Sequence, residues 1–342
     1  MYEDHYGLSA KPFQLTPDPA FWFDSATHRK AMAYLGYGLA QGEGFIVITG
    51  EVGAGKTTLV AHLLETVDRD TLNPIRLVST QVGDEDMLRL TAQAMGIDTV
   101  GLAKGQLLGE IERQLHAVAR GGRRTLLIVD EAQSLGASAI EELRMLSNFT
   151  AGGHALLQIV LLGQPEFRER LYTGAECEQL RQRVIATHHL EPMEAEEIEP
   201  YLAHRLARVG WKGRPDFTTD ACSALYRASG GIPRVINQLA SRAMLYGSVE
   251  GIDVLDKDVI DTVVADQADD TPARAPVQPT RLHLAPNTAP AAAQPDPAIE
   301  RRIAELEARL EDQDQALRQV LQLLVDWVEA DSPAQARMRE TA

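Results

Sequence analysis

The sequence predicts a layered α/β domain on a parallel sheet, a small all-helical domain after it, and a separate helical segment near the C-terminus. Three observations lead to this prediction. Short apolar runs alternate with helical patterns in the first half of the chain, helical patterns then continue without apolar runs, and a proline-rich stretch follows. The length of 342 residues is sufficient for about two domains.

Five short apolar runs are expected to form the strands of the sheet. They are residues 44–50, 75–82, 125–130, 157–163 and, more weakly, 184–190. Such apolar runs are typical of strands that are covered on both faces, as in a parallel sheet. Helical patterns lie between them at residues 57–67, 86–95, 106–119 and 139–149. The alternation therefore predicts right-handed crossovers and a layered α/β domain.

Changes of pattern set the domain boundaries. Residues 1–193 are expected to form the α/β domain, with a helix at 25–41 before the first strand. Four helical patterns at 194–209, 219–228, 233–247 and 257–264 predict an all-helical domain over residues 194–266. Residues 267–297 are rich in Pro and Ala, with seven prolines between Asp269 and Pro297, and are expected to form a disordered linker.

Residues 298–330 carry the pattern of a coiled-coil helix. Apolar residues recur at alternating steps of four and three from Ile299 to Trp327, and Gln313 is the one polar residue in the series. Such a helix needs a partner to cover its apolar stripe. We expect self-association or docking on a partner protein, and a helix folded back onto the body is the alternative. Residues 331–342 are expected to form a flexible tail.

The composition excludes several classes of protein. The formal net charge is −16, and residues 271–342, with eight Arg against eleven Asp and Glu, carry −3 of it. The remaining −13 on residues 1–270 argues against general nucleic-acid binding, which depends on basic side chains. No apolar run is long enough to span a membrane. Cys177 and Cys222 lack metal-ligand spacing, so we expect reduced thiols in a cytoplasmic protein.

Residues 50–57, GEVGAGKT, match the pattern G-x-x-x-x-G-K-[ST] of a phosphate-binding loop in full. The loop follows an apolar strand and opens a helix, which is the context that the motif requires. Its backbone N–H groups and the helix N-terminus favour phosphate. We expect Lys56 to reach the β- and γ-phosphates of ATP and Thr57 to hold Mg²⁺. The residues expected to bind the nucleotide are Gly50, Glu51, Val52, Gly53, Ala54, Gly55, Lys56, Thr57 and Thr58.

An acidic pair, Asp130 and Glu131, ends the apolar run at residues 125–130. Ligands of open α/β sheets bind at the edge where the strands end. Asp130 is therefore expected to orient Mg²⁺, and Glu131 to act as the base that activates the attacking water. The alternative is a strand that ends in solvated acids.

Four further polar residues are candidates for supporting roles. Gln164 follows the run at 157–163 and could sense the γ-phosphate or position water. Arg181 or Arg183 could reach the ATP of a neighbouring subunit as an arginine finger. Arg234 begins a helix and could contact the nucleotide from the helical domain. For each of them, an ordinary exposed side chain is the alternative.

Several segments resemble AAA+ ATPases of the ExeA-like, general-secretion-pathway A type, and more closely the branch found with exosortase and PEP-CTERM exopolysaccharide systems. The resemblance spans roughly residues 1–250. It rests on YGL with KPF and PDP near the N-terminus, GEGFIVITGE, LIVDEAQ, ELRMLSNF, LGQPE, LRQRV and GGIPR. The combination of LSNF, GQPE and LRQR is much more specific than the phosphate-binding loop alone.

This resemblance implies an α/β nucleotide domain with a helical lid. It implies that residues 6–23 help to bind the adenine side, that Arg234 is the sensor of the lid, and that Arg181 or Arg183 is the finger of a homo-oligomer. It also suggests a partner in an envelope export system, reached through the C-terminal helix, which would bring a cytoplasmic ATPase to the inner membrane. The ExeA-like transmembrane segment and peptidoglycan-binding domain have no match here. The alternatives are a DNA-associated ATPase of the transposition or replication-initiator type and a slowly hydrolysing nucleotide switch.

Overall fold

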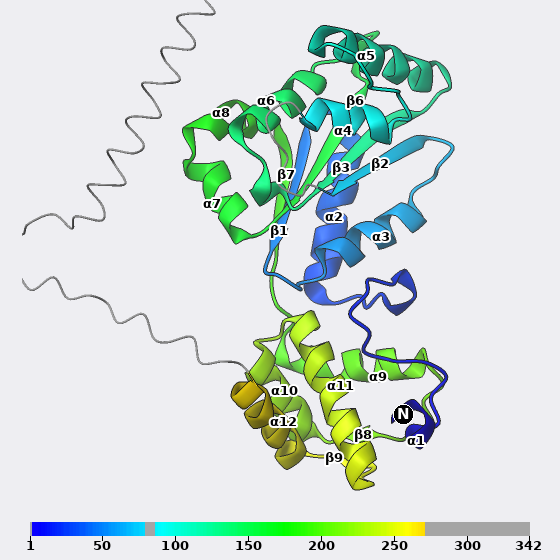
Figure 1. Ribbon diagram of the computed structural model, residues 1–342, viewed down its shortest axis with the longest axis vertical. Coiled ribbons are helices and arrows are strands. Elements are labelled where there is room, and N and C mark those ends of the chain that lie inside the picture. The colour runs from blue at the N-terminus through cyan, green and yellow to red at the C-terminus, as the bar shows by residue number, and fades with distance from the viewer. Residues whose placement is uncertain (1, 79–85, 271–342) are drawn as a thin grey trace, which may run out of the picture. The chain divides into compact units, whose positions relative to one another are not determined.

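The computed structural model describes residues 2–78 and 86–270, and these residues belong to the same unit of the structure (Figure 1). The predicted coiled coil at 298–330 and the tail at 331–342 lie outside the described residues, as does the predicted linker beyond residue 270.

The centre of the unit is a five-stranded sheet in which all neighbouring strands are parallel. The strands are β1 (Phe45–Gly50), β2 (Leu72–Val78), β3 (Arg124–Asp130), β6 (Leu157–Gly163) and β7 (Val184–Leu190), in the order β2-β3-β6-β1-β7. The predicted α/β class is confirmed, and a strand lies at each of the five predicted runs, although residues 79–82 of the second run lie outside the described residues. β2 begins three residues before the predicted start at residue 75, because the pairing with β3 extends back to Leu72 opposite Arg124.

Helices cover both faces of the sheet, which makes three layers (Figure 1). One face packs against α2 (Ala26–Gln41) and α3 (Lys56–Thr66). The other face packs against α4 (Asp86–Ala94), α5 (Lys104–Arg120), α6 (Ala137–Leu146), α7 (Pro165–Thr173) and α8 (Glu178–Arg181). Successive strand residues point to opposite faces, so Ile46 and Ile48 join the first core while Phe45 and Val47 join the second.

The helices α7 and α8 and the small antiparallel pair β4 (Thr150–Ala151) and β5 (His154–Ala155) were not indicated by the sequence pattern. The reason is clear in α7, where most side chains are polar and only Phe167 and Leu171 are buried. A helix with so few buried positions gives almost no periodic signal.

In the described residues that follow the sheet, the chain forms helices and one very short strand pair. They are α9 (Ile198–Ala207), α10 (Thr219–Ser229), α11 (Pro233–Glu250) and α12 (Lys257–Asp270), with β8 (Asp216–Phe217) parallel to β9 (Val254–Leu255). Local chemistry sets the ends of α10, since the Thr218 hydroxyl accepts a hydrogen bond from the Ala221 N–H and Gly230 ends the helix in a left-handed conformation. Within the described part of the chain, no helix has the length and apolar character required to cross a membrane.

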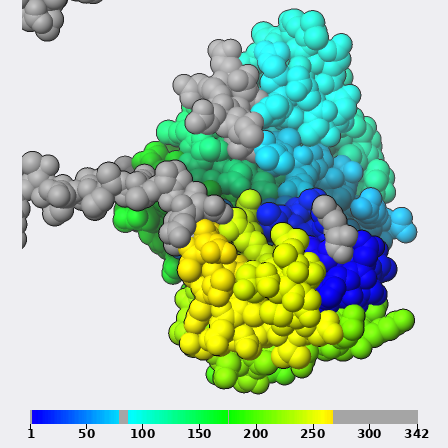
Figure 2. Space-filling model, turned by 60° about the horizontal axis from the view of Figure 1, so that its bottom comes forward, coloured from blue at the N-terminus to red at the C-terminus, as the bar shows by residue number. Residues whose placement is uncertain are grey.

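The N-terminal residues pack into the core of the helical part, not into that of the sheet. Tyr2 and Tyr6 of α1 (Tyr2–Tyr6) and Phe13 are buried there. The Tyr6 hydroxyl donates to the Ile252 carbonyl at 3.0 Å, and Figure 2 shows the N-terminal segment, in blue, beside the yellow helices. The predicted division assigned residues 1–193 to the nucleotide domain. Tyr2, Tyr6 and Phe13 differ from this division, because their aromatic side chains complete the core of the helical part.

Candidate nucleotide site

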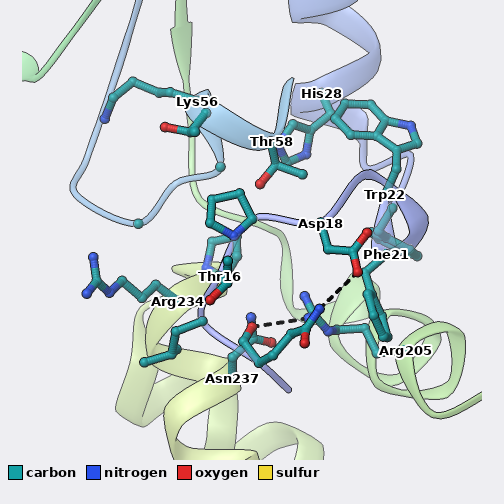
Figure 3. Close-up of a pocket in the computed structure, with 18 of the residues that line it drawn as sticks. Thr16, Asp18, Phe21, Trp22, His28, Lys56, Thr58, Arg205, Arg234 and Asn237 are labelled. Atoms are coloured by element: carbon teal, nitrogen blue, oxygen red, sulfur yellow. Dashed lines mark hydrogen bonds between the residues drawn. The ribbon is translucent and has the colours of Figure 1, made fainter. Parts of the chain in front are cut away.

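Many of the expected site residues line one pocket of about 200 Å³ (Figure 3). The phosphate-binding loop, Glu131 and Gln164 line it from the side of the sheet. Residues 14–18 and 21–23 line it from the N-terminal segment, and Tyr201, Arg205 and Arg234 line it from the helical part. The pocket lies where β1, β3 and β6 end, which is where open parallel sheets bind their ligands.

Two glycines give the phosphate-binding loop its shape. Gly53 and Gly55 have φ angles of 88° and 98°, which side-chain-bearing residues rarely adopt. A Cβ atom on Gly55 would also lie 2.7 Å from Nε2 of His28, and one on Gly53 would lie 2.4 Å from Cβ of Arg234. Both positions therefore require glycine for space as well as for conformation. The helix α3 begins directly after Gly55, so its N–H groups open toward the loop.

Lys56 is largely buried, and its ammonium group is held at the loop. Its Nζ donates to the carbonyls of Gly50 at 2.6 Å and Glu51 at 2.9 Å. Burial lowers the pKa of Lys56, while the nearby carboxylates of Glu131 and Asp130 act in the opposite direction. The loop thus holds one positive charge beside the acidic pair, as a site for a phosphate chain requires.

Thr57 and Asp130 lie together, as expected of residues that hold Mg²⁺. The Thr57 hydroxyl donates to Oδ2 of Asp130 at 3.2 Å, and Asp130 is only 4% exposed. A hydroxyl and a carboxylate are ligands that Mg²⁺ prefers, so these side chains fit the ion. Arg76 of β2 donates to the same Oδ2 at 3.0 Å, which the sequence did not predict.

Glu131 stands at the end of β3 with its carboxylate held by two amides. Gln164 donates from Nε2 to Oε2 of Glu131 at 3.2 Å, and the side-chain amide of Gln133 donates to the same oxygen. The backbone of Glu131 has φ 56° and ψ 42°, and no other non-glycine residue within the described ranges has a positive φ. The predicted base and the predicted sensor are therefore in direct contact, and Gln133 joins them.

Aromatic residues and a buried arginine form the end of the pocket away from Lys56 (Figure 3). Arg205 donates from Nε to the Pro12 carbonyl at 2.7 Å and from Nη1 to the Tyr201 hydroxyl at 3.0 Å. Its guanidinium lies 4.8 Å from the centre of the Phe21 ring. These contacts attach the N-terminal segment to the helical part at the place where a base could bind.

His28 supports the loop from behind. Its Nδ1 lies 2.7 Å from Oγ of Ser25, the residue that caps α2. Burial lowers the pKa of His28 to about 4, with Glu197 and Asp24 raising it and His62 lowering it further. The imidazole is thus neutral near pH 7. It lies beside Gly55 and makes a T-shaped contact with Trp22, with the ring centroids 4.9 Å apart.

Arg234 reaches the pocket through both its backbone and its side chain. Its N–H donates to the Gly53 carbonyl at 3.2 Å, and its side chain is exposed and lines the pocket. This hydrogen bond joins the start of α11 directly to the phosphate-binding loop. A role of Arg234 as the lid sensor stays a prediction that fits this position.

Arg181 and Arg183 do not line the pocket of their own chain. Nη1 of Arg181 donates to the carbonyls of Leu171, at 3.2 Å, and Tyr172 at the end of α7. Nη1 of Arg183 donates to the Ser147 hydroxyl at 3.0 Å. An arginine finger acts on the nucleotide of a neighbouring subunit, so their distance from this pocket agrees with that role but does not test it.

Sequence reasoning missed the residues that support the site from other elements. These are Ser25, His28, Arg76, Gln133, Tyr201 and Arg205. Only Gln133 carried a usable signal, since it lies two positions after Glu131 on the same turn. The others are brought to the pocket by tertiary packing.

The comparisons with known proteins agree with this geometry. Residues 39–171 match the family described as an AAA domain. The parallel sheet and the complete phosphate-binding loop agree with this match, so the chain has the P-loop fold of an AAA domain.

The sequence is 36% identical over 252 residues to general secretion pathway protein A of Aeromonas hydrophila. The match covers 73% of this chain and 46% of that protein, so the chain spans about half the length of this relative. This similarity supports the predicted ExeA-like resemblance, whereas the exosortase and PEP-CTERM branch stays a prediction.

Two solved structures show a similar fold. ORC2 of Aeropyrum pernix has a TM-score of 0.55 at 17% identity over 75% of this chain and 72% of that one. Cdc6p of Pyrobaculum aerophilum has a TM-score of 0.57 at 13% identity over 71% of this chain and 67% of that one. At these identities the similarity concerns the fold alone.

Proposed function

We propose that the chain binds Mg·ATP in this pocket and hydrolyses it to ADP and phosphate with Glu131 as the general base. The observation that carries the proposal is that Lys56, Thr57 and Glu131 line one pocket with an aromatic end, while Asp130 lies against the Thr57 hydroxyl. Lys56 neutralises charge on the β- and γ-phosphates. Thr57 and Asp130 hold Mg²⁺, which supplies further charge neutralisation when it is bound.

The hydrolysis step uses one free oxygen of Glu131. Within the described residues, both amide donors of the site bind Oε2, and Oε1 accepts no hydrogen bond. Oε1 takes a proton from a water molecule while the water oxygen bonds to the γ-phosphorus. The bond from that phosphorus to the β,γ-bridging oxygen breaks, and ADP leaves.

In the cell, the chain acts as a homo-oligomer that supports assembly or operation of an envelope export system, of the exopolysaccharide kind associated with exosortase and PEP-CTERM proteins. The support for a secretion role is the similarity to general secretion pathway protein A over 73% of the chain. Residues 298–330 would recruit this cytoplasmic ATPase to a partner at the inner membrane, since their apolar stripe needs a second helix.

A pull-down from the native host tests this role. The Glu131→Gln protein with ATP serves as bait, beside the same protein lacking residues 271–342. We expect the full-length bait to retain a membrane-associated partner and the shortened bait to lose it, with ATP binding equal in both. Recovery of nucleic acid instead of a membrane-associated partner, or equal recovery of the partner by both baits, would contradict the recruitment proposal.

A further inference from the structure

The turn that follows β3 holds the predicted base in an unusual position. Glu131 has the left-handed backbone described above, which is unfavourable for a residue other than glycine. Such a conformation persists only where surrounding contacts maintain it. The Glu131 N–H donates to Oδ1 of Asp130 at 3.0 Å, and its carbonyl accepts from the Ser134 hydroxyl at 2.7 Å. These contacts fix the backbone and leave the direction of the side chain to be determined.

The side chain of Gln133 determines that direction. Its amide N–H₂ group donates to Oε2 of Glu131, and its amide oxygen accepts the backbone N–H of Gln164 at 3.1 Å. The Gln133 carboxamide therefore makes a hydrogen bond at each end, one with the carboxylate of Glu131 and one with the backbone that follows β6. Because the Gln164 side chain also donates to Oε2, this oxygen receives two hydrogen bonds and Oε1 stays available to water.

The turn carrying Gln133 is itself anchored to α7. Arg170 donates from Nη1 to the Gln133 carbonyl at 3.3 Å and from Nη2 to the Leu135 carbonyl at 2.8 Å. Its guanidinium lies 5.5 Å from the centre of the Phe167 ring, and Phe167 is fully buried. The support of Gln133 therefore extends into the hydrophobic core, which limits the movement of its amide.

From this geometry we propose that Gln133 is a positioning residue for ATP hydrolysis: its carboxamide ties Oε2 of Glu131 to the backbone of Gln164 and so aims Oε1 at the attacking water. The inference rests on the proposed function, because it assumes Glu131 to be the base. It assigns Gln133 no contact with the nucleotide, so loss of its amide should affect the chemical step and not binding.

The experiment compares two substitutions of Gln133 with a control glutamine. Gln133→Met keeps the length and volume of the side chain without its hydrogen bonds, and Gln133→Ala removes the side chain. Gln93→Ala is the control, since Gln93 is exposed on α4 and donates to Thr99 at 3.1 Å, away from the pocket. We expect kcat to fall about tenfold to a hundredfold in both Gln133 variants, since a small misplacement of a reacting group costs up to about this factor. KM, ATP affinity and the thermal midpoint should stay near those of the control.

A double-mutant cycle with Glu131→Gln separates positioning from general structural support. If Gln133 acts through Glu131, Gln133→Met should cause no further loss of kcat once Glu131 is replaced, because the group being aimed is gone. Additive losses in the cycle, a loss of ATP affinity that matches the loss of kcat, or parental kcat in both Gln133 variants would overturn the inference. If Glu131→Gln alone kept the parental kcat, the base assignment itself would fail, a result that is distinguishable from failure at Gln133 alone.

Discussion

The buried His28 makes the stability of the protein depend on pH in a defined window. Burial lowers its pKa to about 4, from the ordinary value of 6.5 for a histidine. Between these values the unfolded chain binds a proton that the folded chain does not, so stability is present above about pH 6.5 and is lost as pH falls toward 4. Between these two pKa values, protonation of His28 in the unfolded chain lowers the free energy of unfolding by about 3 kcal/mol, at about 1.4 kcal/mol per pH unit.

The experiment lowers the pH from 7.5 to 5.5 and compares the resulting loss of unfolding free energy in the parent with that in His28→Asn. This range stays above the sequence pI of about 5.0, where solubility falls. At pH 5.5 the unfolded His28 is mostly protonated, so its contribution to the loss of unfolding free energy is about 1 kcal/mol. Asn keeps an acceptor for the Ser25 hydroxyl but cannot titrate, so the variant should lack this part of the pH dependence.

Equilibrium urea unfolding followed by circular dichroism measures the effect. The absolute stability of His28→Asn will be lower at every pH, because the smaller side chain leaves space behind Gly55. The comparison therefore uses the slope of the unfolding free energy against pH. The other histidines contribute equally to this slope in both proteins, so a difference between the slopes is due to His28. Equal slopes in the two proteins would refute the claim that His28 is held neutral behind the loop.

Three further predictions concern the remaining parts of the pocket. Lys56→Ala should lower ATP affinity by at least about tenfold in equilibrium binding, because the phosphate chain loses its charged partner, and unchanged affinity would contradict the assignment of the loop. Arg205→Met should lower the free energy of unfolding by about 2–3 kcal/mol, because it leaves the Pro12 carbonyl without its donor. Arg205→Met should also weaken adenine-nucleotide binding. If its unfolding free energy and its nucleotide affinity both equalled those of the parent, Arg205 would not hold the N-terminal segment. Arg181→Ala or Arg183→Ala should lower turnover with ATP binding kept, and specific activity of the parent should rise with protein concentration. A concentration-independent activity that neither substitution lowers would place the finger elsewhere or indicate a working monomer.

The central sheet could be predicted because its signals are local. The strands β1, β3 and β6 are fully buried apart from Arg124, so each appears in the sequence as a mostly apolar run. The phosphate-binding loop is a contiguous motif, and the end of β3 places Asp130 and Glu131 beside it. Contiguous motifs of this kind need no knowledge of the tertiary structure.

The surroundings of the loop could not be predicted because they depend on contacts across the chain. The Arg205 guanidinium binds the Pro12 carbonyl across 193 positions of sequence, and no periodic pattern records such a contact. The packing of Tyr2 and Tyr6 into the helical core is equally non-local. Arg76 lies on an otherwise ordinary strand, and only the pairing of β2 with β3 brings it to Asp130.

Single-turnover hydrolysis of ATP by the Glu131→Gln protein tests the assignment of Glu131 as the base most directly. We expect ATP to bind with an affinity within about threefold of the parent, since the proposed role of Glu131 involves the attacking water and not the ground-state nucleotide. Hydrolysis of the bound ATP should slow by at least about a hundredfold, because the amide cannot accept the proton of the attacking water. Hydrolysis at a rate comparable to that of the parent would contradict the assignment of Glu131 as the base.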